Sequence, residues 1–143
     1  MRYWDTSAIV PLLVDEATSD AVRDTFEADP LVVTWWGTAV ECVSALARLE
    51  REGAITPAEM QRASERLDAL ELTWAEVQPS DQVRALAARL LRVHTLRAAD
   101  AFQVAAALVA AEGHPGSLTI VSLDERQILA AEREGLRAVQ PAA

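Results

Sequence analysis

The sequence predicts an α/β layer fold with a largely parallel sheet. Short strand-like runs alternate along the chain with longer segments of helical periodicity, which is typical of proteins whose helices connect parallel strands. The run at residues 31–35, Leu-Val-Val-Thr-Trp, is almost continuously apolar and partly β-branched. That pattern indicates a strand that helices cover on both faces, as in parallel sheets.

The expected elements follow one another in a regular order. We expect strands at residues 2–4, 31–35, 72–77, 118–122 and 136–139, of which the third is the weakest. We expect helices at residues 8–13, 17–28, 38–52, 56–71, 81–93, 98–111 and 124–134. The first of these helices has Pro11 in its first turn, where proline is tolerated. Because no repeat, linker or low-complexity segment divides the chain, residues 1–141 are expected to form a single domain.

Capping residues mark several helix boundaries. Thr56 followed by Pro57 favours a helix start, because threonine caps free N–H groups and proline fits the first helical position. Thr38 and Glu41 have the spacing of a capping box. Gly53 is suited to end the helix that they open.

The segment from Ala98 to Ala111 is apolar at every position except Asp100 and Gln103. Sequence rich in Ala and Leu, without Gly or Pro, favours helix, and a helix that is apolar on all sides belongs in the interior. Because Asp100 and Gln103 are three residues apart, they share one side of this helix. A buried carboxylate needs donors or a cation. Asp100 is therefore either a helix-start residue helped by the dipole and by Arg97, or part of a larger acidic site.

Composition narrows the classes of function. The chain has 143 residues, a hydrophobic fraction of 51% and one cysteine, Cys42, so it holds no disulfide framework or thiolate metal cluster of its own. No apolar run is long enough to span a membrane, and the start of the sequence lacks the apolar core of a secretory signal. We therefore expect a cytoplasmic protein without a membrane partner.

The charge balance is strongly acidic. A net charge of −9 argues against a module that clamps phosphates with basic side chains, but not against a nuclease whose metal ions supply positive charge. All 13 basic residues are arginine. Arg84, Arg89 and Arg92 form either a basic strip for nucleic acid or an ordinary solvated helix face. Neither His94 nor His114 has the spacing of a zinc site or of a Ser/His/Asp triad.

Four acidic residues share one place in the expected fold. Asp5, Glu41 and Asp124 each follow a strand at the start of a helix, and Asp100 opens the buried helix. In parallel sheets this edge is where ligands bind. Carboxylates gathered there repel one another unless a cation lies between them, and an oxygen-only set favours Mg²⁺ or Mn²⁺. Such a site suits phosphodiester hydrolysis, because a metal lowers the pKa of bound water and stabilises charge on the phosphate.

Four motifs in the same order resemble the sequence blocks of PIN-domain nucleases, and their spacing is similar to that of VapC-type toxins from toxin–antitoxin pairs. The motifs are Tyr3-Trp4-Asp5-Thr6-Ser7-Ala8, Thr38-x-x-Glu41, Leu96-Arg97-x-x-Asp100-Ala101 and Val121-Ser122-Leu123-Asp124-Glu125-Arg126. The resemblance implies a PIN-like three-layer α/β fold with a short, mainly parallel central sheet flanked by helices. One departure is the run Trp35-Trp36-Gly37, which is bulkier than the family pattern.

The resemblance also implies a Mg²⁺- or Mn²⁺-dependent endoribonuclease with RNA as its substrate. Its catalytic residues and metal ligands correspond to Asp5, Glu41, Asp100 and Asp124. Thr6 or Ser7 would support these acids by hydrogen bonds. The resemblance further implies a homodimer and a cognate small antitoxin protein as partners. We expect an apolar groove that accepts an antitoxin segment, with an antitoxin arginine reaching the acids.

Other readings of the acidic residues stay open or are excluded. An aspartate-nucleophile phosphatase or a receiver domain normally needs a lysine near the phosphoryl group, and this chain has none. A PIN-like domain that has lost catalysis and serves as a protein- or RNA-binding scaffold is the main alternative. A nuclease directed at DNA rather than RNA is compatible with the same residues.

Overall fold

A central sheet of five strands organises the structure, which is a computed structural model that describes residues 1–142. The strands are β1 (Arg2–Trp4), β2 (Val32–Trp35), β3 (Ala75–Val77), β4 (Thr119–Val121) and β5 (Arg137–Val139). Their order across the sheet is β3-β2-β1-β4-β5, and every neighbouring pair is parallel. The expectation of a mainly parallel sheet is therefore confirmed, and the weakest expected strand forms the edge strand β3.

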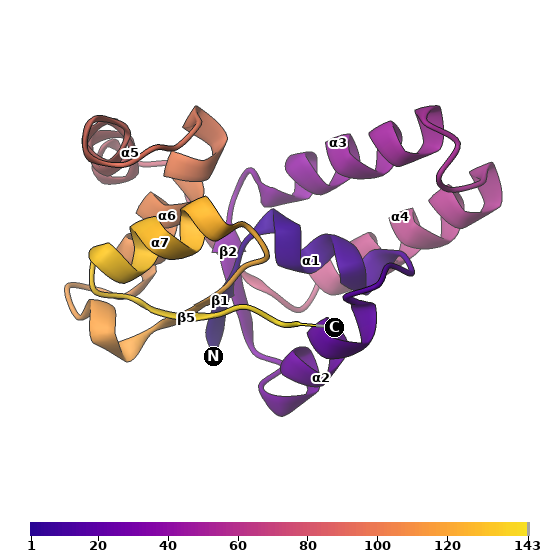
Figure 1. Ribbon diagram of the computed structural model, residues 1–143, viewed down its shortest axis with the longest axis horizontal. Helices are drawn as coiled ribbons and strands as arrows, with labels where there is room; N and C mark the ends of the chain where they lie inside the picture. The colour runs from indigo at the N-terminus through magenta and orange to yellow at the C-terminus, as the bar shows by residue number, and fades with distance from the viewer. Residues whose placement is uncertain (143) are drawn as a thin grey trace.

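Helices cover both faces of this sheet and give the fold three layers (Figure 1). They are α1 (Thr6–Leu13), α2 (Ser19–Ala28), α3 (Thr38–Arg51), α4 (Pro57–Glu71), α5 (Asp81–Val93), α6 (Ala98–Ala110) and α7 (Glu125–Arg133), with a short 3₁₀ turn at Pro115–Ser117. Helices α1 to α4 pack on one face, and α5 to α7 on the other. Figure 1 shows α3 and α4 running side by side as a hairpin that extends away from the sheet.

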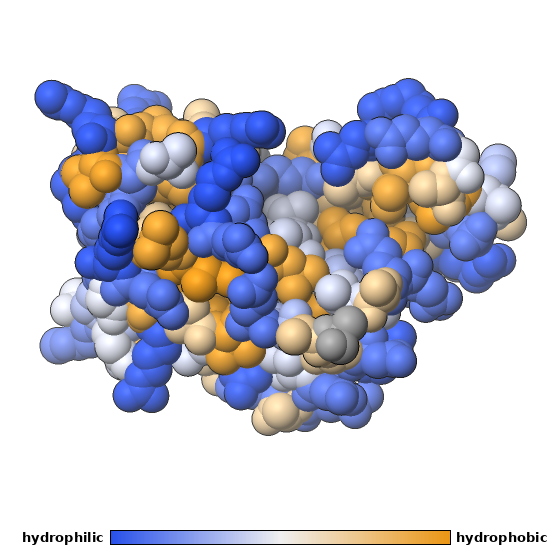
Figure 2. Space-filling model, in the orientation of Figure 1, coloured by the Kyte–Doolittle hydropathy of each residue, from blue (hydrophilic) through white to orange (hydrophobic). Residues whose placement is uncertain are grey.

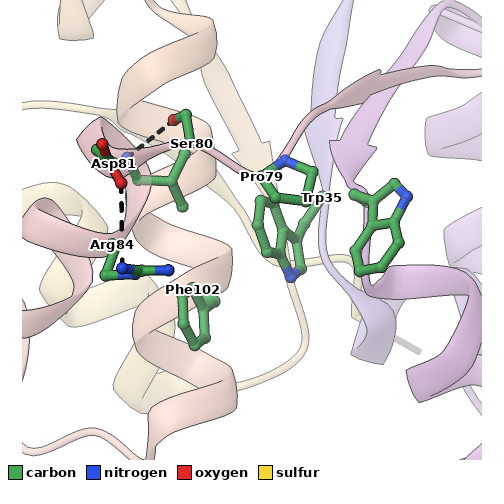
Figure 3. Close-up of a pocket in the computed structure, with 8 residues that line it drawn as sticks. Trp35, Pro79, Ser80, Asp81, Arg84 and Phe102 are labelled. Atoms are coloured by element: carbon green, nitrogen blue, oxygen red, sulfur yellow. Dashed lines mark hydrogen bonds and ion pairs between the residues drawn. The ribbon is translucent and has the colours of Figure 1, made fainter.

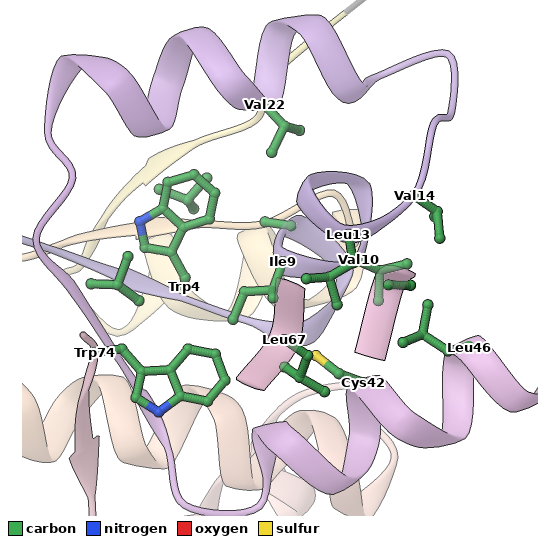
Figure 4. Close-up of a cluster of buried hydrophobic side chains, with 14 of the residues drawn as sticks. Trp4, Ile9, Val10, Leu13, Val14, Val22, Cys42, Leu46, Leu67 and Trp74 are labelled. Carbon is green, nitrogen blue, oxygen red and sulfur yellow. The ribbon is translucent and has the colours of Figure 1, made fainter. Parts of the chain in front are cut away.

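Two apolar layers hold the sheet between the helices. Adjacent residues of β1 point to opposite faces, as the twofold repeat of a strand requires. Trp4 packs with α1 to α4, where Ile9 and Leu46 are also fully buried (Figure 4). Tyr3 packs on the other face with Ile120 and with alanines of α6. Because alanine side chains are small, α6 lies close against the sheet.

Helix boundaries differ from the expected ones at two places that matter for the site. Helix α1 begins at Thr6 and not at Ala8, which places Pro11 in its second turn. The capping box expected from Thr38 and Glu41 does not form, since Gly37 occupies the cap position and makes no side-chain cap. Both residues are used in tertiary contacts instead.

The remaining helix boundaries lie within two residues of the expected ones. The capping box at Thr56 is present, with Glu59 bonded back to the backbone of Thr56. Helix α2 starts two residues later than expected, at Ser19. Within residues 1–142, no helix has the length and apolar character that crossing a membrane requires.

Candidate active site

An acidic cleft of about 620 Å³ opens where the carboxyl ends of the strands meet the starts of α1, α3, α6 and α7. We use the name acidic cleft for the cavity lined by Thr6, Ser7, Val10, Glu16, Glu41, Ser44, Ala45, Arg48, Arg97, Ala99, Asp100, Asp124 and Gln127. In the space-filling view, hydrophilic residues cover much of the outer surface, with hydrophobic residues gathered between them (Figure 2). Three of the four acids expected at the site line this cleft, and Asp5 is buried next to them.

Asp5 is fixed at the junction of β1 and α1. Its side chain has no exposed surface and caps α1 through the Ala8 N–H. The Ser7 hydroxyl donates to Oδ1 at 2.8 Å, and the Ser122 hydroxyl donates to Oδ2 at 3.0 Å. Burial raises the pKa of Asp5 to about 7, against these hydrogen bonds and with a smaller contribution from the charge of Asp124. The folded protein therefore holds a carboxyl that changes charge near neutral pH.

Glu41 is held by a glutamine from the opposite layer of the fold. The Gln103 amide nitrogen donates to Oε2 of Glu41 at 2.7 Å, while its carbonyl accepts from the Tyr3 hydroxyl at 2.6 Å. The same nitrogen lies 3.0 Å from Oγ1 of Thr38 and 3.2 Å from Oγ1 of Thr6. The pKa of Glu41 is raised, mainly by burial and also by the charge of Asp100, against hydrogen bonds from Gln103 and Thr6 that lower it.

Asp100 and Asp124 each stabilise the start of a helix. Oδ2 of Asp100 accepts from the Arg97 backbone N–H at 3.1 Å, so Arg97 contributes its main chain. Oδ1 of Asp124 accepts from the N–H groups of Arg126 and Gln127 at the start of α7. The Gln127 side chain then links the two helices by donating to Oδ1 of Asp100 at 3.1 Å.

The four acids are gathered at one cleft, but their carboxylates are directed to protein donors. Among residues 1–142, no group of three His, Cys, Asp or Glu side chains is arranged so that it could hold a metal ion as it stands. The carboxylates interact electrostatically in pairs. The charge of Asp124 raises the pKa of Asp5, and the charge of Asp100 raises the pKa of Glu41. Convergence on one ion thus requires side-chain rotation away from the present hydrogen bonds.

By chemical type, the donors of the cleft fit a hard divalent cation. Every acidic group is an oxygen ligand, and the chain's two histidines and its cysteine do not line the cleft. Oxygen-only sets suit Mg²⁺ or Mn²⁺. The starts of α1, α6 and α7 also lie at the cleft, and the positive ends of their dipoles favour ionised carboxylates there.

Three polar residues of the site have roles that the sequence motifs did not reveal. Ser122 bonds Asp5 and the backbone of Asp124, and its position two residues before Asp124 is the one sequence signal from which this role could have been found. Gln103 was visible as a polar position in an apolar helix, but its partners come from three distant segments. Gln127 had the pattern of a simple capping residue. Ser7 and Thr6 do support the acids, directly and through Gln103 respectively.

Fold and site together define a class of protein. An all-parallel sheet with helices on both faces is the architecture of a three-layer α/β domain, and the acidic cleft lies at the carboxyl edge, where ligands bind in such sheets. The chain belongs to the PIN-domain family, since the family model described as PIN domain matches residues 2–133. No sequence among the curated proteins matches it.

Solved structures similar to this chain share its fold over nearly its whole length. The crystal structure of FitAcB from Neisseria gonorrhoeae aligns with a TM-score of 0.71 and 20% identity, covering 99% of this chain and 98% of that one. FitAB bound to an IR36 DNA fragment aligns with a TM-score of 0.67 and 19% identity, covering 99% and 95%. A toxin–antitoxin complex from Klebsiella pneumoniae aligns with a TM-score of 0.63 and 15% identity, covering 99% and 98%.

Proposed function

We propose that this PIN-domain chain is a Mg²⁺- or Mn²⁺-dependent endoribonuclease that acts as the toxin of a type II toxin–antitoxin pair. The observation that carries the proposal is the acidic cleft, where Glu41, Asp100 and Asp124 line one cavity and Asp5, with a pKa of about 7, is buried next to it. Ionised carboxylates gathered at one cleft repel one another, and a bound cation relieves this repulsion. The proposed metal ligands are Asp5, Glu41, Asp100 and Asp124.

The chain's own residues prepare this site for the reaction. A bound divalent ion supplies Lewis acidity, which lowers the pKa of water and balances charge on the phosphate. Ser7 and Ser122 fix both oxygens of Asp5, and Gln103 orients Glu41. These bonds hold the acids at the cleft before an ion binds, and the carboxylates turn away from them to converge on it.

Two arginines in the cleft support binding of RNA, an anionic polymer, by an acidic protein. Arg48 and Arg97 both line the acidic cleft, Arg48 from α3 and Arg97 from the start of α6. Guanidinium groups bind phosphate oxygens in a bidentate manner. We assign these two arginines to the phosphates that flank the cleaved bond.

The proposed antitoxin partner has a suitable surface. An apolar groove of about 450 Å³ runs between α1, α2 and α4, with Leu12, Phe26 and Leu70 among its lining residues and Arg23 and Arg66 also lining it. An amphipathic segment with acidic flanks fits such a groove. Two of the similar solved structures are a toxin–antitoxin complex and FitAB. Pull-down of the protein encoded beside this gene, with and without Leu70→Glu, tests the assignment, and undiminished capture by the variant contradicts it.

The proposed homodimer draws support from exposed apolar side chains on α3. Val40 is 73% exposed and Val43 is 50% exposed, one turn apart along the helix. A second copy that covers these valines would remove apolar surface from water. Analytical ultracentrifugation of the protein and of Val40→Asp measures this directly, and a monomer at all concentrations contradicts the dimer.

Cleavage of structured RNAs tests the proposed function. We expect cuts with Mg²⁺ or Mn²⁺ and none with EDTA, and we expect Asp100→Ala to abolish them while the fold stays intact. Asp68→Ala removes an exposed carboxylate of α4, outside the cleft, and should cleave as the parent does. Unchanged cleavage by Asp100→Ala would contradict the site.

A second candidate function is a catalytically silent scaffold that binds protein or RNA. It is favoured by the observation that the carboxylates of all four proposed ligands are bonded to protein donors and that, among residues 1–142, no three acids are arranged to hold an ion. Calorimetric titration with Mn²⁺ separates the two candidates. A scaffold that lost its chemistry should give no heat of binding, whereas a nuclease should bind the ion at the cleft.

A further inference from the structure

An aromatic pocket of about 340 Å³ lies beside the acidic cleft and has no role in the proposed chemistry. We use the name aromatic pocket for the cavity lined by Trp35, Trp36, Pro79, Ser80, Asp81, Val83, Arg84 and Phe102. Figure 3 shows Asp81 and Arg84 on the side of the pocket away from Trp35, with Phe102 between the two sides. Its volume falls within the range of small-molecule sites, about 300–1,000 Å³.

The aromatic rings of the pocket pack against one another. Trp35 stacks on Phe102, with ring centroids 5.5 Å apart and planes inclined by 2°. Trp36 meets Trp35 edge to face at 6.5 Å. Gly37 permits this arrangement, because a Cβ there would lie 2.6 Å from Nε1 of Trp35. The pocket therefore has a rigid aromatic wall.

Packing accounts for Trp35 but leaves Trp36 unexplained. Trp35 is half-buried and packs against the cores beneath α5 and α6. Trp36 keeps 54% of its surface exposed. A half-exposed indole that lines a cavity and meets a stacked pair edge to face is suited to stack on another flat ring.

Chain connectivity places the aromatic pocket next to the proposed site. Trp36 is two residues before Thr38, whose hydroxyl lies 3.0 Å from Nε2 of Gln103, and the same nitrogen donates to Glu41. Phe102 directly precedes Gln103 on α6, although the helical rotation turns its side chain to a different side from that of Asp100. Trp36 lies at the turn between β2 and α3, five residues before Glu41. A strand of nucleic acid whose phosphate occupies the acidic cleft can thus reach the aromatic pocket with a neighbouring base.

The polar side of the pocket matches the other parts of a nucleotide. Arg84 is 82% exposed and its contact with Asp81 is long, at 4.0 Å, so its guanidinium is accessible to a phosphate. Ser80 caps α5 with its side chain and also lines the pocket, so the start of that helix lies at the pocket. The combination of aromatic faces and a cation is the usual way in which proteins bind single-stranded nucleic acid.

We propose that the aromatic pocket binds one unpaired base of the RNA strand next to the cleaved phosphate, by stacking on Trp36 with Arg84 at the adjoining phosphate. This inference rests on the proposed nuclease function and adds a feature of the substrate to it. The substrate region is single-stranded at that position, since a paired base has no free face to offer. The stacking is tolerant of base identity, because every base has a π-face.

Binding of a short fluorescent single-stranded RNA tests the proposal without cleavage. The measurements use the cleavage-silent Asp100→Ala protein in EDTA, with Trp36→Ala, Trp36→Phe and Leu72→Ala added in turn. We expect Trp36→Ala to bind about 10-fold more weakly and Trp36→Phe to recover most of the loss. Leu72 is an exposed apolar side chain that does not line the pocket, and its removal should leave binding unchanged.

Abasic RNAs identify the base that enters the pocket. A set of RNAs is made in which each position in turn lacks its base. For one of these RNAs, loss of the base should weaken binding to the protein that keeps Trp36. The same loss should leave binding to the Trp36→Ala variant unchanged. This non-additivity is the mark of a direct contact. Fully additive losses at every position overturn the proposal.

Three further results distinguish failure of the pocket proposal from failure of the proposed function. If the parent cleaves RNA with metal, and Trp36→Ala cleaves with the same KM and at the same positions, the pocket proposal fails while the nuclease stands. If Trp36→Ala turns a dimer into a monomer and its loss of binding follows that change, the pocket is a contact between copies and the proposal is overturned. If the parent neither binds nor cleaves RNA, the nuclease proposal fails, and the pocket proposal fails with it.

Discussion

At the residue scale, the burial of Asp5 makes the stability of the folded protein depend on pH. Its pKa rises from 3.8 to about 7, with burial as the main cause. A raised pKa means that the folded protein binds this proton more tightly than the unfolded chain does. The contribution of Asp5 to stability is therefore fully present below about pH 4 and is lost as the pH rises through about 7.

We predict that Asp5→Asn removes this pH dependence. In EDTA, the parent should lose unfolding free energy between pH 4 and pH 7, at up to about 1.4 kcal/mol per pH unit. The asparagine has no charge to bury, so its advantage over the parent should grow with pH. Urea unfolding of both proteins at pH 5 and pH 8 measures the difference. An advantage that is the same at both pH values would mean that Asp5 is not the group responsible.

Gln103 bonds both to Tyr3 in the core and to the acid Glu41. Its removal should therefore change both the stability of the fold and the pKa of Glu41. Gln103→Leu leaves the buried Tyr3 hydroxyl without its acceptor, at a cost of about 1–3 kcal/mol in unfolding free energy. It also removes a hydrogen bond that lowers the pKa of Glu41. The acid limb of the cleavage–pH profile should therefore move to higher pH.

A double variant provides the control for Gln103. Tyr3→Phe combined with Gln103→Leu removes both partners of the buried bond, so part of the lost stability should return. The shift in the cleavage profile should remain, since Glu41 still lacks its donor. If stability and the profile recover together, Gln103 acts only through the core.

The individual acids could be predicted from sequence, but their partners could not. Asp5, Glu41 and Asp124 each follow a strand, so the topology alone brings them to one edge of the sheet. The bond between Gln103 and Glu41 joins residues 62 positions apart, and no local pattern encodes it. The rotation of each carboxylate toward a protein donor is likewise decided by tertiary neighbours.

At the element scale, the turn between β2 and α3 connects the sheet to both the acidic cleft and the aromatic pocket. Thr34 at the end of β2 donates from its hydroxyl to the Trp4 carbonyl at 2.6 Å and contacts Thr38 at 2.8 Å. This pairing explains why the expected capping box is absent: the Thr38 hydroxyl lies in a buried polar network rather than at the helix start. At α4 no tertiary partner competes for Thr56, and there the local signal predicted the cap correctly.

Gly37 in this turn should resist substitution even by alanine. Its φ of −77° is open to any residue, so the obstacle is the indole of Trp35, 2.6 Å from the position of a Cβ. Gly37→Ala should displace Trp35 from Phe102 and lower the unfolding free energy by about 1–3 kcal/mol. Urea unfolding and the near-ultraviolet circular dichroism of the tryptophans report both effects.

Gly116→Ala is the matched control for this substitution. A Cβ at position 116 meets no heavy atom within 4 Å, and its φ is outside the left-handed region. Alanine there should leave stability unchanged or slightly raised, because the unfolded chain loses freedom. Equal effects of the two substitutions would show that contact with Trp35 is unimportant.

At the scale of the whole molecule, alternation of strands and helices was enough to predict the fold, because parallel strands require crossing helices. The net charge of −9 gives the chain a general preference for cations, and the sheet concentrates four acids at one edge. General attraction to cations is weak and is screened by salt. A specific site has a different signature, since a bound ion stabilises the fold by mass action.

We therefore predict that Mn²⁺ raises the melting temperature through the acidic cleft. At 100 times its Kd, an ion that binds only the folded protein adds about 2.7 kcal/mol, which corresponds to roughly 5–10 °C for a chain of this size. The increase should be smaller at pH 6 than at pH 8, because a proton competes for Asp5. Asp100→Ala should lose most of the increase, and Asp68→Ala should keep it. An equal increase in both variants, or one that disappears in 0.5 M salt (roughly a 4 Å Debye length), would assign the effect to surface charge rather than to a site.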